Sequence, residues 1–99
     1  MREMGESNKN KKGLEQIKVD LKILAENHRL EILQYLKKKR EAPVGEIADH
    51  VKISFKATSK HLLFLAKKEI LKRRYDGPFV LYSISDNLSG FNKLIISHL

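Results

Sequence analysis

The spacing of apolar residues changes once along this chain, near residue 70, and that change limits the folds that it can adopt. Up to residue 68, apolar residues recur at steps of three and four, which is the period of an α-helix. Beyond it they alternate at a step of two, which is the period of a β-strand. With 99 residues the chain is long enough for one small domain. We therefore expect a mainly α fold with a small β-hairpin.

The helical part divides at its capping residues and at Pro43. Residues 1–13 are polar and lysine-rich and are expected to be a disordered basic tail, so the domain should cover residues 14–99. Asn27 is the expected cap of the second helix, Ser54 that of the fourth, and Asp86 or Asn87 that of the last. The helices are expected from about Leu14, from Asn27 into the KKKR run at 37–40, over 45–51, over 55–68, and after residue 87.

Residues 70–84, ILKRRYDGPFVLYSI, read as two strands joined by a tight turn at Asp76-Gly77-Pro78. Alternation along both strands lets one face lie on the core while the other stays in water. Before the third helix, EAPV can form an extended stub at most, because Pro43 lacks a backbone N–H.

The segment SFKATSKHLLFL, residues 54–65, separates polar from apolar residues along its length. A helix-turn-helix needs this arrangement, because the N-terminal half of its second helix enters the major groove while the other half packs on the domain. With a basic hairpin behind it, the motif becomes a winged helix. Phe55 could contact a thymine methyl or pack on the third helix, and His61 could bond a phosphate or the adjacent helix.

Each predicted DNA-contacting residue has an expected role. Facing the bases should be Lys56, Ala57, Ser59 and Lys60. Nearer the sugar-phosphate backbone should be Lys52, Ser54, Thr58, His61, Lys72, Arg73 and Arg74. Tyr82 could donate to a phosphate or pack across the hairpin, which is the commoner role of an aromatic residue there.

The distribution of charge supports this prediction. The chain carries a net charge of +8, and residues 52–75 hold eight basic residues against one acidic residue, Glu69. The remaining residues hold twelve basic and eleven acidic groups, so nearly all the excess charge lies in one quarter of the chain. Such concentration is typical of a surface that binds phosphates.

Two segments resemble the ArsR-type winged-helix transcriptional regulators. LKILAENHRLEILQYL, residues 21–36, resembles their opening helices, and GEIADHVKISFKATSKHLLFLAKKEIL, residues 45–71, resembles their Ser-x-His-Leu region. The resemblance covers roughly residues 14–99 and departs from the family at Glu69, where glycine is usual before the wing. It implies a homodimer that binds a pseudo-palindromic operator in double-stranded DNA and usually represses transcription. The polar N-terminal residues do not read as a signal peptide, so we expect a cytoplasmic protein.

The same resemblance implies a dimer interface formed by the first and last helices. The residues expected there are Leu14, Ile17, Leu21, Leu24, Leu88, Phe91, Leu94 and Ile95. Relatives bind metals through cysteines on the third helix or through aspartate and histidines near the last. Here there is no cysteine, and only Asp86 and His98 lie in the second region, so we expect no metal and no cofactor.

The sequence fits other functional classes less well. No phosphate-binding loop, carboxylate pair or nucleophile-base motif is present, so an enzyme is not expected. No apolar run could span a membrane. A non-specific architectural nucleic-acid-binding protein and a winged-helix protein-interaction module stay open as alternatives.

Overall fold

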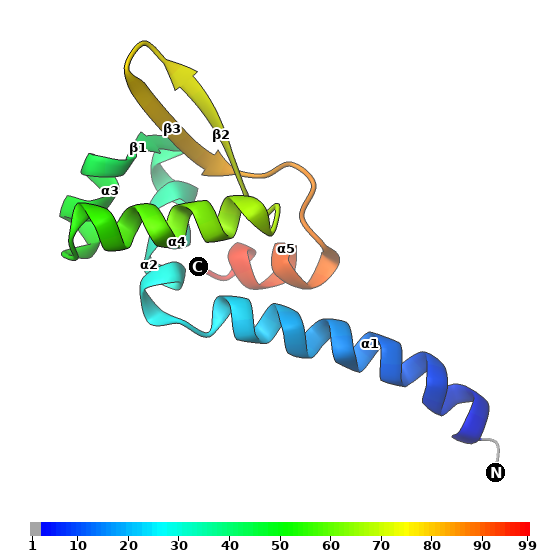
Figure 1. The fold of residues 1–99 in the computed structure, drawn as a ribbon. Helices are drawn as coiled ribbons and strands as arrows, with labels where there is room; N and C mark the ends of the chain where they lie inside the picture. The colour runs from blue at the N-terminus through cyan, green and yellow to red at the C-terminus, as the bar shows by residue number, and fades with distance from the viewer. Residues whose placement is uncertain (1–2) are drawn as a thin grey trace.

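A computed structural model describes residues 3–99, with the side chains of residues 13–99. Within this range the elements follow in the order α1 (Glu3–Leu24), α2 (Asn27–Lys39), β1 (Glu41–Pro43), α3 (Val44–Val51), α4 (Phe55–Lys67), β2 (Leu71–Asp76), β3 (Phe79–Ile84) and α5 (Gly90–Ser97). The helices form one body, from which α1 projects on one side and the β2–β3 hairpin on another (Figure 1). The expected fold, mainly α with a small hairpin, is confirmed.

The core lies where α2, α3 and α4 meet the sheet. Ile32, Leu33, Ile47, Leu62 and Leu65 are each 0% exposed. Within α2 they are adjacent and within α4 they are three apart, so each helix turns an apolar stripe inward. Burial of these stripes fixes α4 against α2 and α3.

The sheet has three antiparallel strands in the order β1-β3-β2. β2 and β3 are joined across a two-residue turn, since Asp76 pairs with Phe79, and Gly77 has φ +60°. Glycine adopts this positive φ without a steric penalty, which is why Asp-Gly suits the turn. The EAPV segment forms more than a stub, because residues 41–43 pair with residues 81–83 of β3.

Two helix caps differ from the expectation. Glu26, rather than Asn27, is the N-cap of α2, and its carboxylate accepts a hydrogen bond from the backbone N–H of His28. Ser89, rather than Asp86 or Asn87, caps α5 through a bond from the N–H of Asn92. Ser54 caps α4 as predicted.

The N-terminal segment differs as well. Residues 1–13 were expected to be a disordered tail, but α1 begins at Glu3, because a helix nucleated further along the chain can propagate through residues of fair helix propensity. Residues 1–2 lie outside the described part of the chain. Within residues 3–99 no helix is both long and apolar enough to cross a membrane.

Candidate nucleic-acid interface

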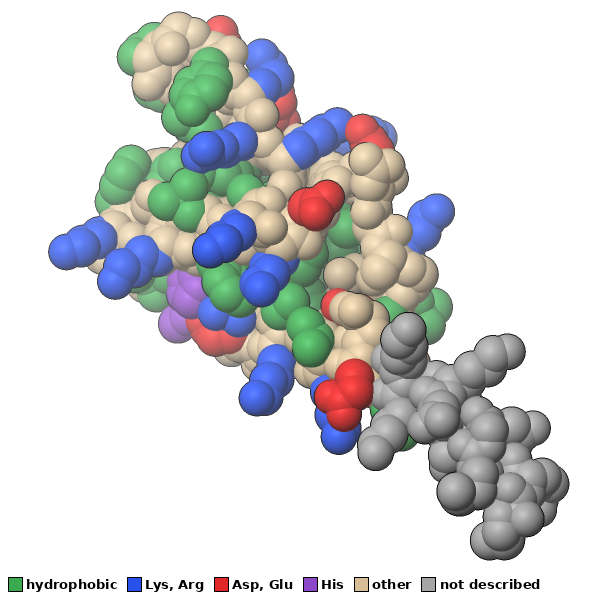
Figure 2. Space-filling view, turned by 45° about the vertical axis from the view of Figure 1, so that its right-hand side comes forward, with side chains coloured by type: hydrophobic (Ala, Val, Ile, Leu, Met, Phe, Trp, Pro, Cys, Tyr) green, Lys and Arg blue, Asp and Glu red, His purple; other side chains and the backbone are tan. Residues whose placement is uncertain are grey.

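The N-terminal half of α4 is a polar, exposed surface on a rigid base. Lys56 and Lys60 are exposed, Ala57 and Ser59 are partly exposed, and the following Leu62 is fully buried. This is the separation along the helix that the sequence predicted. Figure 2 shows lysine and arginine side chains spread over this part of the surface.

Ser54 holds the start of this helix in place. Its hydroxyl oxygen accepts a hydrogen bond from the N–H of Ala57 at 3.0 Å, so the O–H remains free to donate. Thr58 turns inward: it is 0% exposed, and its hydroxyl donates to the carbonyl of Ser54 at 2.8 Å. Thr58 therefore supports the helix start from below and cannot reach the DNA backbone as we expected.

Lys52 lies in the turn between α3 and α4. It caps α3 in the left-handed conformation, with φ +60° and ψ +42°. Its side chain is exposed beside the N-terminus of α4, where the unpaired backbone N–H groups already favour an anion. This places a cation and a helix N-terminus on the same surface.

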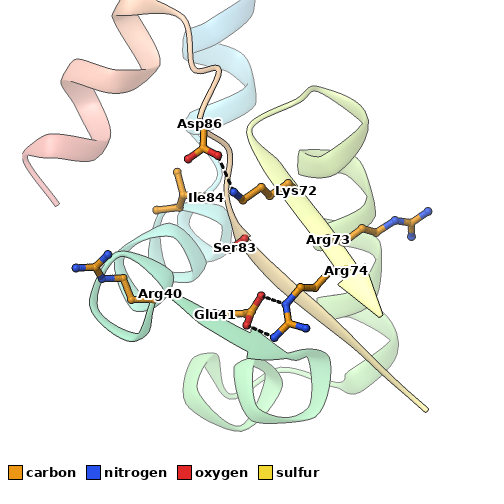
Figure 3. A pocket seen from close by; sticks show the side chains of 8 residues that line it. All are labelled: Arg40, Glu41, Lys72, Arg73, Arg74, Ser83, Ile84 and Asp86. Carbon is orange, nitrogen blue, oxygen red and sulfur yellow. Dashed lines mark hydrogen bonds and ion pairs between the residues drawn. The ribbon is translucent and has the colours of Figure 1, made fainter. Parts of the chain in front are cut away.

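The hairpin presents its basic residues on two different faces. Arg73 pairs with Tyr82 across the strands and so shares the core side of the sheet with the buried Leu71. Lys72 and Arg74 lie on the opposite face, which Figure 3 shows with Arg73 pointing away from it.

On the sheet face that points away from the core, the two cations are paired with carboxylates. Arg74 binds both carboxylate oxygens of Glu41, at 2.7 and 2.8 Å, and Lys72 donates to Asp86 at 2.7 Å. The hydrogen bonds from Arg74 hold the pKa of Glu41 below its usual value. The residues that make these contacts line a hollow of about 630 Å³, together with Arg40 and Ser83. Of the three predicted hairpin cations, only Arg73 has no hydrogen-bonded acid within the described residues.

Tyr82 does not belong to this surface. Its side chain is 2% exposed and packs in the core cluster, so it cannot donate to a phosphate as we expected. From the sequence, Tyr82 on the return strand could either pack or contact a phosphate, since strand alternation alone does not say which face is buried.

His61 contacts a neighbouring element. Its Nε2 lies 3.1 Å from Oε2 of Glu26, so of its two expected roles the structure shows the contact with an adjacent helix. Burial lowers the pKa of His61, although the Glu26 charge opposes that change. Burial also raises the pKa of Glu26, but the N–H of His28 and nearby positive charges outweigh it and leave that pKa below its usual value.

Two aromatic side chains are exposed near the hairpin tip, and the sequence predicted a surface role only for the first of them, Phe55. Phe55 at the start of α4 is 62% exposed, so packing on α3, one of its two expected roles, leaves most of the ring in water, and Phe79 at the tip of the hairpin is 58% exposed. They line a largely apolar hollow of about 430 Å³ between the hairpin tip and the start of α3. Because apolar residues in an alternating strand predict burial, the pattern gave no signal for Phe79.

The expected dimer surface is largely exposed. On α1, Leu14, Ile17 and Leu21 are 53%, 39% and 50% exposed, and on α5 Leu94 is 57% exposed. Phe91 and Ile95 on α5 are partly exposed, and so is Leu88 in the loop before α5. Leu24 is 4% exposed and belongs to the core of the chain, so it is not available for a partner as we expected.

The two residues considered for a metal have other contacts. Asp86 accepts from Lys72, and Nδ1 of His98 lies 2.9 Å from the carbonyl oxygen of Leu94. Asp86 therefore joins the loop after β3 to β2, and His98 contacts the C-terminal end of α5.

The comparisons with known proteins agree with this geometry. The model of the arsR family of bacterial regulatory proteins matches residues 26–73. The chain is 31% identical to HlyU from Vibrio cholerae over 92% of both chains, with a TM-score of 0.78. It is 30% identical to the transcriptional repressor PagR of Bacillus anthracis, over 87% of this chain and 94% of that one, with a TM-score of 0.69. It is 25% identical to the homodimeric winged helix-turn-helix DNA-binding domain Mb0332 from Mycobacterium bovis, over 86% and 75%, with a TM-score of 0.69.

Proposed function

The chain belongs to the ArsR family of bacterial regulatory proteins, and from that premise we propose that this DNA-binding transcriptional regulator is a homodimeric repressor whose α4 reads an operator. The observation that carries the proposal is the exposed polar half of α4, held by the Ser54 cap and by the buried Leu62 and Leu65. A helix fixed in this way can enter the major groove, which is about 12 Å wide. The proposed base contacts are Lys56, Ala57, Ser59 and Lys60.

The proposed backbone contacts lie on either side of α4. Lys52 and Ser54 flank the helix start, and Arg73 extends from the hairpin. Lys72 and Arg74 contribute less to binding in this proposal, because each is already paired with a carboxylate. A guanidinium that keeps its carboxylate partner releases fewer counterions from DNA than a free one.

The homodimer and the repressor role are supported by two relatives and by the surface. PagR is a transcriptional repressor and Mb0332 is a homodimeric domain. A second copy would cover the apolar side chains on α1 and α5, which are costly to leave in water over a contiguous area. We also propose that residues 14–99 make up the DNA-binding domain, with two copies reading the two halves of an inverted repeat.

The first experiment is selection from a randomised DNA duplex pool by the purified protein at about 0.15 M salt, with the mass of the bound species measured alongside. An enriched inverted repeat, with half-sites one helical turn or a multiple of it apart and bound by a dimer, is the expected result. Retention without an enriched sequence would instead favour the architectural function. No retention at low salt would favour a protein-interaction module.

Lys60→Glu tests the docking face on the selected operator. We expect the dissociation constant to rise at least about fivefold, which is about 1 kcal/mol, because a base-facing cation becomes an anion. Lys38→Glu is the matched control, since Lys38 is an exposed lysine at the end of α2 and changes the net charge equally. An unchanged affinity in folded Lys60→Glu, measured by fluorescence anisotropy, would place the DNA on another face.

A further inference from the structure

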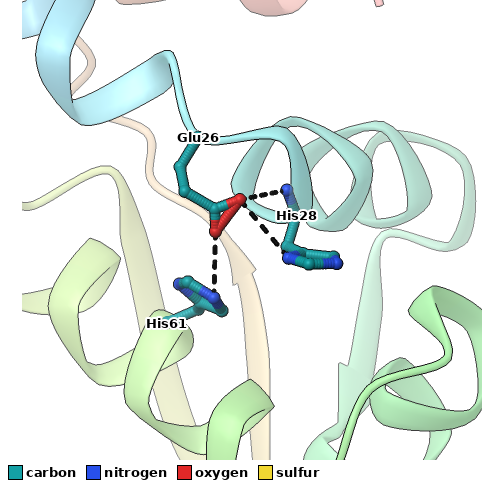
Figure 4. Close-up of side chains that lie close together, drawn as sticks. All are labelled: Glu26, His28 and His61. Atoms are coloured by element: carbon teal, nitrogen blue, oxygen red, sulfur yellow. Dashed lines mark hydrogen bonds and ion pairs between the residues drawn. The ribbon is translucent and has the colours of Figure 1, made fainter.

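Glu26, His28 and His61 bring three metal-ligating side chains together at one corner of the molecule. Glu26 lies between α1 and α2, His28 lies in the first turn of α2, and His61 lies in the middle of α4. Figure 4 shows the carboxylate of Glu26 in contact with both histidines. One ligand atom from each residue lies within 4.8 Å of the other two.

The distances suit a small divalent ion. Zinc binds imidazole nitrogen and carboxylate oxygen at about 2.0–2.2 Å in a tetrahedron, so neighbouring ligand atoms are about 3.3 Å apart. Here Nε2 of His61 lies 3.1 Å from one carboxylate oxygen of Glu26, and Nδ1 of His28 lies 3.4 Å from the other. The two histidine rings lie with centroids 5.9 Å apart and an interplanar angle of 38°.

The cluster is open to solvent. The side chains of Glu26, His28 and His61 are 33%, 40% and 20% exposed, so water can reach the cluster and occupy a fourth position. The nearby cation, Arg29, is directed elsewhere: it donates to the carbonyl of Ile23 at 2.9 Å and lies 4.1 Å above the ring of Phe64. Its charge weakens the attraction for a cation without occupying the position of the ion.

We propose that Glu26, His28 and His61 form a binding site for a zinc-class divalent metal ion, with water as the fourth ligand. Two histidines and one carboxylate are donors that zinc accepts readily. The bound ion would join the start of α2 to the middle of α4. Metal occupancy would thus stabilise the position of the proposed recognition helix within a single chain.

The test uses the full-length protein without DNA, so its failure would leave the proposed DNA-binding function standing. Zinc is titrated into the metal-free protein by calorimetry, and Co²⁺ is titrated in parallel to record the absorption that reports a low-symmetry, four-coordinate site. We expect one ion per chain, and we expect His28→Gln and His61→Gln each to lower the zinc affinity at least about tenfold. His50→Gln and His98→Gln are the matched controls, because they remove the remaining two histidines of the chain.

Three outcomes would overturn the proposal. They are no zinc binding by the wild type, an equal loss of zinc affinity in all four histidine variants, or a loss of zinc affinity in the control variants alone. If His61→Gln fails to fold by circular dichroism, His28→Gln decides the question, since the more exposed ring of His28 makes its contacts at the surface.

Discussion

Glu69 occupies a backbone conformation that glycine usually provides. Its φ is +62°, and its N–H bonds the carbonyl of Ala66 while that of Ile70 bonds the carbonyl of Leu65. This pair of bonds is the Schellman arrangement that ends a helix, in which the residue at the Glu69 position is left-handed. The glycine-to-glutamate departure seen in the sequence therefore leaves the geometry of the helix end intact and adds steric strain.

We predict that Glu69→Gly stabilises the protein by about 0.5–1 kcal/mol. Removing Cβ relieves a left-handed strain of about 1–2 kcal/mol, and the greater freedom of glycine in the unfolded chain offsets part of it. Urea denaturation measures the change as a higher midpoint at constant slope. Glu69→Ala keeps Cβ and should bring no such gain, so equal stability of the two variants would contradict the strain.

Tyr35 gives a second prediction at the same scale. Its hydroxyl donates to the Glu46 carboxylate, and this hydrogen bond, burial and the Glu46 charge together raise the pKa of Tyr35 to about 12. Because the folded pKa lies above the unfolded value of about 10, the bond stabilises the protein below pH 10. That contribution disappears as the pH rises through about 12.

Absorbance of the phenolate near 295 nm checks this prediction. One of the three tyrosines should ionise near pH 12 in the folded protein, and Glu46→Gln should bring it back toward pH 10. Tyr35→Phe identifies the transition, since it should remove the late step altogether. A late step that survives in Tyr35→Phe would belong to another tyrosine.

The strands of the hairpin decide which of its basic residues are free to contact DNA. The run Lys72-Arg73-Arg74 reads as one basic cluster, but strand alternation sends its middle member to the opposite face of the sheet. β1 brings Glu41 to the face of Arg74, and the loop after β3 brings Asp86 to Lys72. The formal charge of the hairpin therefore overstates the charge that it can offer to DNA.

We predict that Arg73→Ala and Arg74→Ala differ in their effect on DNA binding. Arg73→Ala should reduce the slope of log affinity against log salt by about 0.9, the value of one lost phosphate contact. Arg74→Ala should change the slope by less, because Arg74 is already paired with Glu41. The measurement is anisotropy on the selected operator over a range of salt concentrations, and equal slope changes would mean that DNA breaks the Arg74–Glu41 pair.

At the scale of the whole molecule, α1 projects from the body and leaves apolar side chains exposed in a single copy of the chain. The chain extends over 58 × 23 × 22 Å, and its radius of gyration of 15.9 Å exceeds the roughly 13 Å of a compact chain of this length. The excess reflects the projection of α1 from the body (Figure 1). Beside α1, Leu21, Leu30, Phe91 and Ile95 line an apolar hollow of about 220 Å³. A projecting helix with exposed leucines beside an apolar hollow is what a dimer would cover.

We predict that Leu94→Glu weakens the dimer at least about tenfold, since it would bury an unpaired carboxylate in an apolar interface. Analytical ultracentrifugation over a range of protein concentrations measures this as a shift toward the mass of one chain. Phe79→Glu is the matched control: Phe79 is equally exposed but lies at the tip of the hairpin, away from α1 and α5. If both variants dissociate alike, or neither does, α5 is not part of the interface.

The sequence by itself determined most of the elements, because their causes are local. Helical and strand periods, the Ser54 cap and the Gly77 turn all act within a few residues, and each was found at or near its expected place. The polar and apolar halves of α4 were equally visible, since a continuous helix keeps the order of its residues.

Only the tertiary structure decided which side chains meet across the chain. Arg74 reaches Glu41 from 33 positions away, Tyr82 turns to the core, and β1 joins the sheet. The cluster of Glu26, His28 and His61 was missed for the same reason, because His61 lies on α4, far along the sequence from Glu26 and His28 at the start of α2. Such contacts depend on which elements pack together in space, and the spacing of side chains within one segment does not say which other segment it will contact.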